Sequence, residues 1–340
     1  MRWQEIKDNP RMKNNLLKRA EILRNIRKFF AEEGFVEIDS PILVAKPNME
    51  PNLEVMETCV KKNTGEKLTA YLITSPEFAL KKILAAGLPK IYQLGKCFRN
   101  FEPWNENHNP EFTLLEWYES GAKYFDLMKR VEDLVRFLAG ENTSINYQNK
   151  EIKIAEPWLR ISLREAWQKY AGVDLNEYLT YDTMRSLVEK KNHPVTANDS
   201  WEDLFFKIFL TEVEPRLAEE ARPVFLYDYP TQMAALSRVK KDDPRYAERF
   251  ELYMGGLEVA NAYGELVDAK EQKQRFLQNQ EEQKKRGFSP REIDEDFLHA
   301  LETGVPECSG IALGVDRLVM LLVDARSITE VAPFTAKDMF

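Results

Sequence analysis

Two arginines stand at positions in the sequence where a phosphate or a carboxylate could be bound. Arg99 follows an expected strand over residues 90–98, and Arg317 opens an apolar helix after the small-residue run 310–316. A guanidinium carries a permanent charge and a planar set of donors that match phosphate and carboxylate oxygens. For Arg99 the alternative is a surface ion pair, which is the commoner state of an arginine at a strand end.

The run from Gly310 to Gly314 places small residues at alternate positions of an expected strand. Glycine at alternate strand positions leaves room for a ligand to approach the backbone. Such ligands are usually flat or phosphorylated. Ala312 stands where the alternation predicts a third glycine, so its methyl group narrows this space.

A carboxylate and a phenol lie two residues apart on the expected strand 112–118. Glu116 and Tyr118 therefore share one face of that strand. A carboxylate and a phenol on one face of an otherwise apolar strand are unusual, because buried charge needs a partner. The alternative is an exposed face of an edge strand.

Two glutamates flank the turn of an expected hairpin over residues 250–266. A two-residue turn at Gly255-Gly256 pairs Glu251 with Ala260, which makes Glu258 the diagonal neighbour of Glu251. Carboxylates brought together in this way repel each other unless a cation lies between them. Magnesium prefers oxygen ligands and completes its shell with phosphate. A salt bridge to a basic residue is the alternative.

Three further polar residues follow Glu258 on the same strand. Asn261, Tyr263 and Glu265 occupy alternate positions, and strict alternation puts them on the face opposite Glu258. If all four serve one pocket, the strand must bulge or twist nearby.

Composition excludes several classes of protein. The chain has 340 residues with a net charge of -8, which argues against a dedicated nucleic-acid binder. Its three cysteines are scattered, which indicates a reduced, cytosolic setting without a zinc site. Its three histidines are too few for a histidine-rich metal site, and no apolar stretch suggests a signal peptide or a membrane span. No histidine or cysteine is placed as a nucleophile, and no Walker-type loop occurs. This combination suits nucleotidyl transfer by positioning and charge stabilisation.

The expected elements alternate between strands and helices, with strands concentrated towards both ends of the sequence. Gly34 ends the first helix, Pro41 lies in the first strand, and Ser75 or Thr74 caps the helix that includes Pro76. Helices are expected at 12–33, 76–86, 125–138, 268–286, 291–303 and 318–323, strands at 35–43, 67–74, 90–98, 112–118, 250–266 and 310–314, and a helical middle at 145–222. The fold class is therefore α+β, a mainly antiparallel sheet flanked by helices.

Three ordered segments resemble the motifs of the class II aminoacyl-tRNA synthetases. The first helix with its Pro41 strand resembles motif 1, Phe98-Arg99-Asn100 with its return strand resembles motif 2, and Gly310 to Arg317 resembles motif 3. The lysyl branch is most similar in detail. The segments that carry this detail are Thr74-Ser75-Pro76-Glu77, His108-Asn109-Pro110-Glu111-Phe112 and Glu258-Val259-Ala260-Asn261.

The resemblance also predicts what the chain lacks. Motif 1 begins by about residue 15, so residues 12–340 are expected to form the catalytic domain, without an N-terminal anticodon-binding OB domain. Such a free-standing core resembles the elongation factor P–(R)-β-lysine ligases. Ala260 and Ala312 agree with that family, whereas lysyl-tRNA synthetases typically have glycine at both positions.

The resemblance implies roles for the polar residues. Arg99 and Arg317 are the implied catalytic residues, and Glu251 and Glu258 the implied magnesium ligands. The implied amino-acid pocket consists of Ser75, Glu77, Glu116, Tyr118, Asn261, Glu265 and Ala312. The implied ATP contacts are Arg99, Asn100, Glu102, His108, Asn109, Phe112, Glu258, Val259, Gly314 and Arg317.

The chain departs from the pattern of this family at two positions. The motif 2 arginine is ordinarily followed two residues later by a glutamate, but Phe101 stands there and Glu102 comes one residue later. The loop to Asn109 is longer by one residue. Ala262 replaces a glycine that is usual after the pocket asparagine.

The function that the resemblance implies is a two-step ligase. Lysine or β-lysine is activated by ATP and Mg²⁺ to an aminoacyl-adenylate, and the acyl group passes to a lysine ε-amine of elongation factor P. A cytoplasmic homodimer is expected, with tRNA an unlikely partner and no membrane involved. The alternatives are a truncated lysyl-tRNA synthetase, a small-molecule amide ligase resembling asparagine synthetase, and an inactive paralogue that senses an amino acid.

Overall fold

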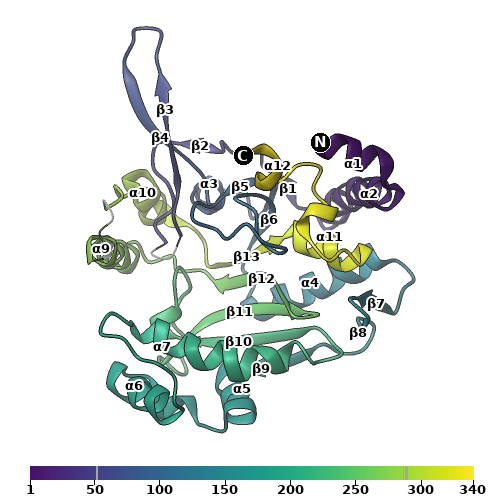
Figure 1. The fold of residues 1–340 in the computed structure, drawn as a ribbon. Coiled ribbons are helices and arrows are strands. Elements are labelled where there is room, and N and C mark those ends of the chain that lie inside the picture. Colours follow the sequence, from purple (N-terminus) through teal and green to yellow (C-terminus); the bar gives the residue numbers. More distant parts are fainter. Residues whose placement is uncertain (51–52, 286, 288–289) are drawn as a thin grey trace. The chain divides into compact units, whose positions relative to one another are not determined.

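The computed structural model describes residues 1–50, 53–285, 287 and 290–340. It divides the chain into two compact units (Figure 1). The first unit consists of Met1–Lys123 together with Leu266–Phe340, and the second of Tyr124–Glu265. In the described part of the chain, no helix combines the length and the apolarity that crossing a membrane requires.

The strands of the first unit run in the order β1-β5-β6-β13. These are β1 Val36–Glu37, β5 Lys90–Phe98, β6 Glu111–Ser120 and β13 Cys308–Gly314. Only β1 and β5 are parallel; the pairs β5–β6 and β6–β13 are antiparallel. Phe30, from helix α2 Pro10–Glu32, stacks on Tyr92 at 4.7 Å and contacts Trp117 at 5.1 Å between ring centroids. Phe30 thus packs against one face of this sheet. The side chains of Glu116 and Tyr118, which alternate with Trp117 along β6, lie on the other face.

Helices surround these strands. They are α1 Arg2–Asp8, α3 Glu77–Ala85, α9 Ala269–Lys285, α10 Glu295–Gly304, α11 Val315–Val323, the short turn Ile328–Glu330 and α12 Ala336–Met339. Helices α3 and α10 pack through Phe78 and Phe297, whose rings stack at 4.2 Å. Both chain ends lie in this unit, α1 near the C-terminal helix α12 (Figure 1).

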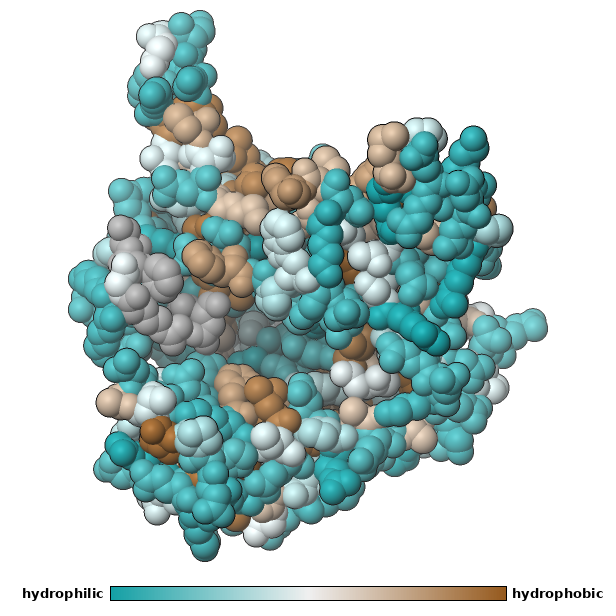
Figure 2. Space-filling view, viewed as in Figure 1, coloured by the Kyte–Doolittle hydropathy of each residue, from teal (hydrophilic) through white to brown (hydrophobic). Residues whose placement is uncertain are grey.

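A three-stranded sheet projects from the first unit as a hairpin (Figure 1). It is built from β2 Leu43–Val44, β3 Met56–Lys61 and β4 Lys67–Leu72. Most of its side chains are exposed, and Figure 2 shows that the outer part of the hairpin is largely hydrophilic.

The second unit has the strand order β12-β11-β10-β9. These strands are β9 Leu159–Ser162, β10 Val224–Pro230, β11 Tyr246–Met254 and β12 Leu257–Gly264, with a separate hairpin of β7 Ser144–Tyr147 and β8 Lys150–Lys153. The pair β9–β10 is parallel and the others are antiparallel. The helices of this unit are α4 Tyr124–Ala139, α5 Leu163–Ala166, α6 Tyr181–Lys190, α7 Trp201–Ile208 and α8 Glu214–Leu217, extended by short 3-10 and π turns. Trp167, Phe205 and Leu226 are among the core residues that these helices and strands bury together.

Most elements expected from the sequence are confirmed. Strand 90–98 is found with the predicted bounds. Helix α2 ends just before Gly34, which adopts the left-handed conformation, and the hairpin turns at Gly255-Gly256. The α+β class is confirmed, because both strand sets are mainly antiparallel and helices flank them. Residue 286, the predicted end of a helix, lies outside the described residues.

Two expectations about elements are wrong, and one helix was not predicted. Residues 35–43 form no single strand, because Pro41 has no N–H to donate and separates β1 from β2. The middle 145–222 contains β7, β8 and β9 before its helices, and buried residues alternate there with period two, as at Ile145 and Tyr147. Helix α1 was not expected; the Asn9 side chain accepts hydrogen bonds from the first turn of α2, which separates the two helices.

Candidate active site

Arg99 lies directly after β5, in the first unit. Its guanidinium carbon is 5.1 Å from the centre of the Phe112 ring, and its backbone N–H donates to the carbonyl of Pro110 at 2.9 Å. The buried Nε of Arg99 has no hydrogen-bond partner among the residues that the structure describes. Within the described residues the guanidinium makes neither an ion pair nor a hydrogen bond, so the surface ion pair considered above is not found. A guanidinium held on an aromatic face without an anion is suited to bind an anionic ligand.

Glu116 and Tyr118 are both buried on β6. The Tyr118 hydroxyl donates to Glu116 Oε1 at 2.8 Å. In the antiparallel ladder Glu116 lies opposite Ala312 and Tyr118 opposite Gly310, so all four residues occupy one face of the sheet. The exposed edge-strand alternative is wrong, and the shared face predicted from the spacing is confirmed.

The methyl group of Ala312 takes part in a small apolar cluster on this face. Ile73, Cys97 and Leu114 form its buried centre, and Ala312 packs against them from the position opposite Glu116. Burial, and then the nearby Glu116, raises the pKa of the Cys97 thiol, so this thiol is not a nucleophile. The extra methyl therefore lies beside the buried carboxylate.

Glu77 opens α3 and is paired with a residue that the sequence analysis did not single out. Lys81, one helical turn later and with 0 % of its side chain exposed, donates to Glu77 Oε1. Ser75 accepts hydrogen bonds from Asn48 Nδ2 at 2.8 Å and from the Glu77 N–H at 3.4 Å. The signal for Lys81 was present as a Glu–Lys pair at i,i+4 spacing inside an apolar helix. Lys81 and Asn48 thus fix the positions of the two predicted pocket residues.

The loop between β5 and β6, residues 100–109, is here called the motif 2 loop. Its extra residue, Phe101, adopts a positive φ of 56° and points its ring outwards with 83 % of its surface exposed. The neighbouring Asn100 N–H donates to the carbonyl of Glu54 at 2.9 Å. Glu102 returns to within 3.9 Å of His108 Nε2. The additional residue is therefore absorbed by a left-handed turn, which leaves Glu102 facing the inside of the loop.

Arg317, near the start of α11, holds the end of the motif 2 loop. Its Nη2 lies 2.9 Å from His108 Nε2, and its Nε donates to the carbonyl of Asn107 at 3.4 Å. Since arginine can only donate, His108 Nε2 is the acceptor and its Nδ1–H donates to Asn105 Oδ1 at 3.1 Å. Burial, together with the charges of Arg317 and Arg99, lowers the pKa of His108 against the opposing effect of Glu102. His108 is therefore neutral at pH 7.

Acidification should weaken this contact. The pKa of His108 lies below the ordinary value of about 6.5, so the ring stays neutral until the pH falls below that value. Protonation then removes the acceptor for Arg317 and places a cation between Arg317 and Arg99. We expect the KM for ATP to rise as the pH falls from 7 to 5.5, and to rise less in His108→Gln, which can accept but does not titrate. An equal rise in both proteins would exclude His108 as the cause.

The remaining predicted ATP contacts of the first unit lie around this loop. The Asn109 side chain donates to the carbonyl of Glu111 at 2.6 Å and accepts from the Ala336 N–H at 2.8 Å. Phe112 lies under Arg99, and Gly314 ends β13 as the N-cap of α11. The structure thus brings Arg99, His108, Phe112 and Arg317 around one loop.

In the second unit, the pairing of the two glutamates differs from the prediction. Glu251 lies opposite Asn261, not Ala260, because the register shifts between Leu252 and Tyr253 and leaves Val259 unpaired. Tyr253 lies opposite Glu258. This bulge places Glu258 on the same face as Glu251 and Asn261, and Tyr263 follows on that face. The bulge that a shared pocket requires is therefore present.

The carboxylate of Glu251 is held by three side chains. Arg249 Nη2 donates to Oε1 at 2.6 Å, while the hydroxyls of Tyr229 and Tyr253 donate to Oε2 at 2.6 and 2.7 Å. Burial, followed by the charge of Glu251, raises the pKa of both tyrosines well above the ordinary value. The salt bridge considered as the alternative for Glu251 is thus found.

Two predicted pocket residues follow on β12 and after it. Asn261 Oδ1 is buried without a hydrogen-bond partner in the described part of the chain, so it is open to accept a hydrogen bond from a ligand. Glu265 is buried and its backbone bridges to Ser237. Both belong to the second unit, as do Glu251 and Glu258.

The donor set on this face offers magnesium few open positions on Glu251, because both oxygens of that carboxylate already accept hydrogen bonds from Arg249, Tyr229 and Tyr253. Glu251 and Glu258 are two carboxylates on one sheet face, and Mg²⁺ commonly uses one or two carboxylates together with phosphate and water. No cluster of three or more His, Cys, Asp or Glu side chains able to hold a metal by itself occurs among the residues described.

Comparison with known proteins decides the family. The family described as tRNA synthetases class II (D, K and N) matches residues 1–338. The chain belongs to the class II tRNA synthetase family. The resemblance expected from the three motifs is confirmed, and in this family's fold all three motifs lie in the first unit, at α2–β1, β5–β6 and β13–α11.

Several curated relatives of this synthetase-family chain share one name. It is 38 % identical over 323 residues to the elongation factor P–(R)-β-lysine ligase of Hamiltonella defensa and to that of Proteus mirabilis. It is 37 % identical to the protein of the same name from Salmonella paratyphi B. Each match covers 94 % of both chains. The chain is therefore an enzyme of the ligase type built on a class II synthetase fold.

Proposed function

We propose that this enzyme activates a lysine-like amino acid, (R)-β-lysine, with ATP and transfers it to a lysine ε-amine of elongation factor P. The name and near-complete coverage of its relatives support the substrate and the acceptor. The observation that supports adenylation most directly is Arg99, whose partly buried guanidinium has no anionic partner in the described part of the chain.

In the first step, a carboxylate oxygen of the amino acid attacks the α-phosphorus of ATP. The bond from that phosphorus to the bridging oxygen breaks, and pyrophosphate leaves with the electron pair. Arg99 binds the carboxylate and an α-phosphate oxygen, and it stabilises the charge that builds up on phosphorus in the transition state. Its stacking on Phe112 keeps the planar donors in place before the substrate arrives.

The amine groups of the substrate are bound by acidic side chains. In the first unit, Glu77 receives the amine of the reacting end, with Ser75 beside it, and Glu116 with Tyr118 receives the distal ammonium. In the second unit, Asn261 and Glu265 contribute an amide and a carboxylate. A buried site built to bind a cation rejects neutral analogues, because its own charges would otherwise stay unpaired.

The nucleotide is bound by the motif 2 loop and by α11. Arg317 binds the phosphate tail, Phe112 stacks on the adenine, and Asn109 shapes the adenine side. Asn100, Glu102, His108, Val259 and Gly314 complete the proposed contacts. Glu251 and Glu258 would hold magnesium, which supplies positive charge to the phosphates when bound.

In the second step, the neutral ε-amine of the acceptor lysine attacks the acyl carbon of the adenylate. A carbon–nitrogen bond forms, the carbon–oxygen bond to AMP breaks, and the nitrogen loses a proton to give an amide. We extend the proposal to a cytoplasmic homodimer whose catalytic domain spans residues 12–340 and which does not use tRNA as acceptor.

The test measures both half-reactions with the purified enzyme. ATP–pyrophosphate exchange should depend on (R)-β-lysine, and radiolabelled β-lysine should then appear on purified elongation factor P. Labelling of tRNA in place of the protein would support a truncated lysyl-tRNA synthetase. Labelling of a small amine would support an amide ligase. The absence of exchange activity with every amino acid tested would support a sensing paralogue.

Selectivity between lysine isomers should depend on Ala312. Its methyl lies opposite Glu116, so Ala312→Gly opens space beside the carboxylate and should shift the ratio of kcat/KM values towards ordinary α-lysine, by about tenfold. One methylene of pocket volume typically changes specificity by this order. ATP–pyrophosphate exchange with each isomer measures the ratio. An unchanged ratio would remove Ala312 from the account of specificity.

A further inference from the structure

The chain's last eight residues contact the motif 2 loop. These residues, 333–340, are here called the C-terminal segment. The backbone N–H of Ala336 donates to Asn109 Oδ1 at 2.8 Å, while the other end of the same amide donates to the carbonyl of Glu111 at 2.6 Å. Both ends of the Asn109 side chain are thus engaged within the protein, and one of them is held by the C-terminal segment.

Two more contacts join the loop to this end of the chain. The Ile328 N–H donates to the carbonyl of Glu106 at 2.8 Å. The rings of Trp104 and Phe340 approach to 6.0 Å between centroids. The loop is therefore held along its length by residues that follow α11.

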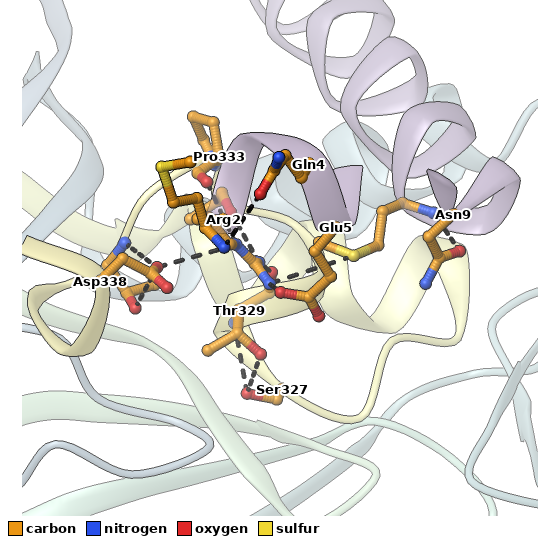
Figure 3. A network of polar contacts seen from close by, with 12 residues as sticks. Arg2, Gln4, Glu5, Asn9, Ser327, Thr329, Pro333 and Asp338 are labelled. Carbon is orange, nitrogen blue, oxygen red and sulfur yellow. Dashed lines mark hydrogen bonds and ion pairs between the residues drawn. The ribbon is translucent and has the colours of Figure 1, made fainter. Parts of the chain in front are cut away.

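Arg2 fixes the C-terminal segment from the opposite end of the sequence, as Figure 3 shows. Only 9 % of its side chain is exposed. Its Nε donates to the carbonyl of Pro333 at 3.3 Å and lies 3.7 Å from Asp338 Oδ2, and its Nη2 donates to the carbonyl of Thr329. One guanidinium therefore binds the segment and the turn before it.

Asp338 connects Arg2 to the motif 2 loop. Its Oδ2 accepts from the backbone N–H of Thr335 at 2.7 Å and from the Thr335 hydroxyl at 2.9 Å. Thr335 directly precedes Ala336, whose N–H reaches Asn109. A continuous series of polar contacts thus runs from Arg2 through Asp338 and Thr335 to the loop, within the first unit.

We infer that the C-terminal segment is a positioning element of the ATP site, with Arg2 and the Ala336–Asn109 hydrogen bond as its fixed points. The inference rests on the proposed function, because it is the motif 2 loop that is proposed to bind the nucleotide. None of its residues is among the proposed substrate contacts. It limits the conformations of the loop before ATP binds, so its loss should weaken ATP binding more than amino-acid binding.

Ala336→Pro removes the N–H donor with little damage to the helix. Ala336 is the first helical residue of α12, where proline is well tolerated, and Thr335 before it is already extended with φ -118° and ψ 173°. The matched control is Ala336→Gly, which keeps the N–H. Loss of one positioning hydrogen bond should raise the dissociation constant and the KM for ATP about tenfold in the proline variant. The KM for the amino acid should change less than twofold, and the glycine variant should resemble the unaltered enzyme for ATP.

A second pair of variants tests the contacts of Arg2 with the C-terminal segment without altering a residue that contacts the loop. Arg2→Met should also raise the KM for ATP several-fold. Its control is Arg27→Met, because Arg27 is an exposed arginine of α2 that pairs with Glu37 of β1 at 2.9 Å. If Ala336→Pro does not fold, this pair decides the question.

The outcomes separate the inference from the proposed function. ATP binding is measured by titration calorimetry and the KM values by ATP–pyrophosphate exchange. An unaltered enzyme that neither binds ATP nor exchanges pyrophosphate would overturn both. An unaltered enzyme that is active, with ATP values unchanged in Ala336→Pro and Arg2→Met, would overturn only the inference. A lowered thermal midpoint with unchanged ATP values would assign the segment a purely structural role.

Discussion

Replacing Arg99 with alanine is expected to lower the kcat for ATP–pyrophosphate exchange by about 10²- to 10³-fold. Its guanidinium is the group proposed to stabilise the charge that develops on the α-phosphorus, and loss of one such donor commonly has an effect of this size. Because the Arg99 guanidinium makes no ion pair within the described residues, its removal leaves no carboxylate unpaired there and should hardly change the free energy of unfolding. Steady-state exchange and urea unfolding measure the two quantities.

Two controls sharpen this prediction. Arg99→Lys keeps the charge but loses the planar donors, so its kcat should remain well below that of the unaltered enzyme. Arg27→Ala removes an exposed arginine that pairs with Glu37 at 2.9 Å, and its kcat should be unchanged. A kcat for Arg99→Ala within threefold of the unaltered value would contradict the proposed role.

Replacing Arg249 with methionine is expected to produce the largest loss of stability, about 3–5 kcal/mol of the free energy of unfolding. Burial opposes the charge of this guanidinium, but Tyr263, Glu251 and Tyr229 leave its pKa raised. The substitution removes its bond to Glu251 and leaves that carboxylate buried with only two hydroxyl donors. Urea unfolding of the variant measures the loss.

The matched control is Arg245→Met in the same unit. Arg245 is half exposed and pairs with Asp243 at 2.7 Å, and exposed pairs of this kind contribute little to the free energy of unfolding. Similar losses in both variants would mean that the buried Arg249–Glu251 pair contributes no more to the free energy of unfolding than an exposed pair does. Restored stability in the double variant Arg249→Met with Glu251→Leu would confirm that the unpaired carboxylate is the cause.

Much of the site in the first unit was predictable, because its residues belong to regular local patterns. Glu116 and Tyr118 share a face because side chains alternate along any strand, and the structure confirms this. Arg317 was expected at the start of an apolar helix and is found there. The contact of Arg317 with His108 was not predicted, since these residues lie 209 positions apart in the chain.

The predicted pairing of Glu251 with Ala260 is wrong, because the bulge at Val259 makes Asn261 the partner. Strand pairing between distant residues here overrides the local pattern. A single extra residue changes which side chains share a face, and no local feature of the sequence marks where it is inserted. The buried lysine next to Glu77 was overlooked for a related reason, because a Glu–Lys pair at i,i+4 spacing is usually a solvent-exposed helix pair.

The sequence by itself determined the family, the fold class and the chemical groups available for adenylation, because residue types and their order along the chain carry that information directly. Only the tertiary structure decided which of these groups have partners. It left Arg99 without an anion among the described residues, gave Glu251 an arginine, and tied Arg2 to the C-terminal segment. Pairing of this kind depends on strand register and on contacts between distant parts of the chain, which local sequence patterns do not specify.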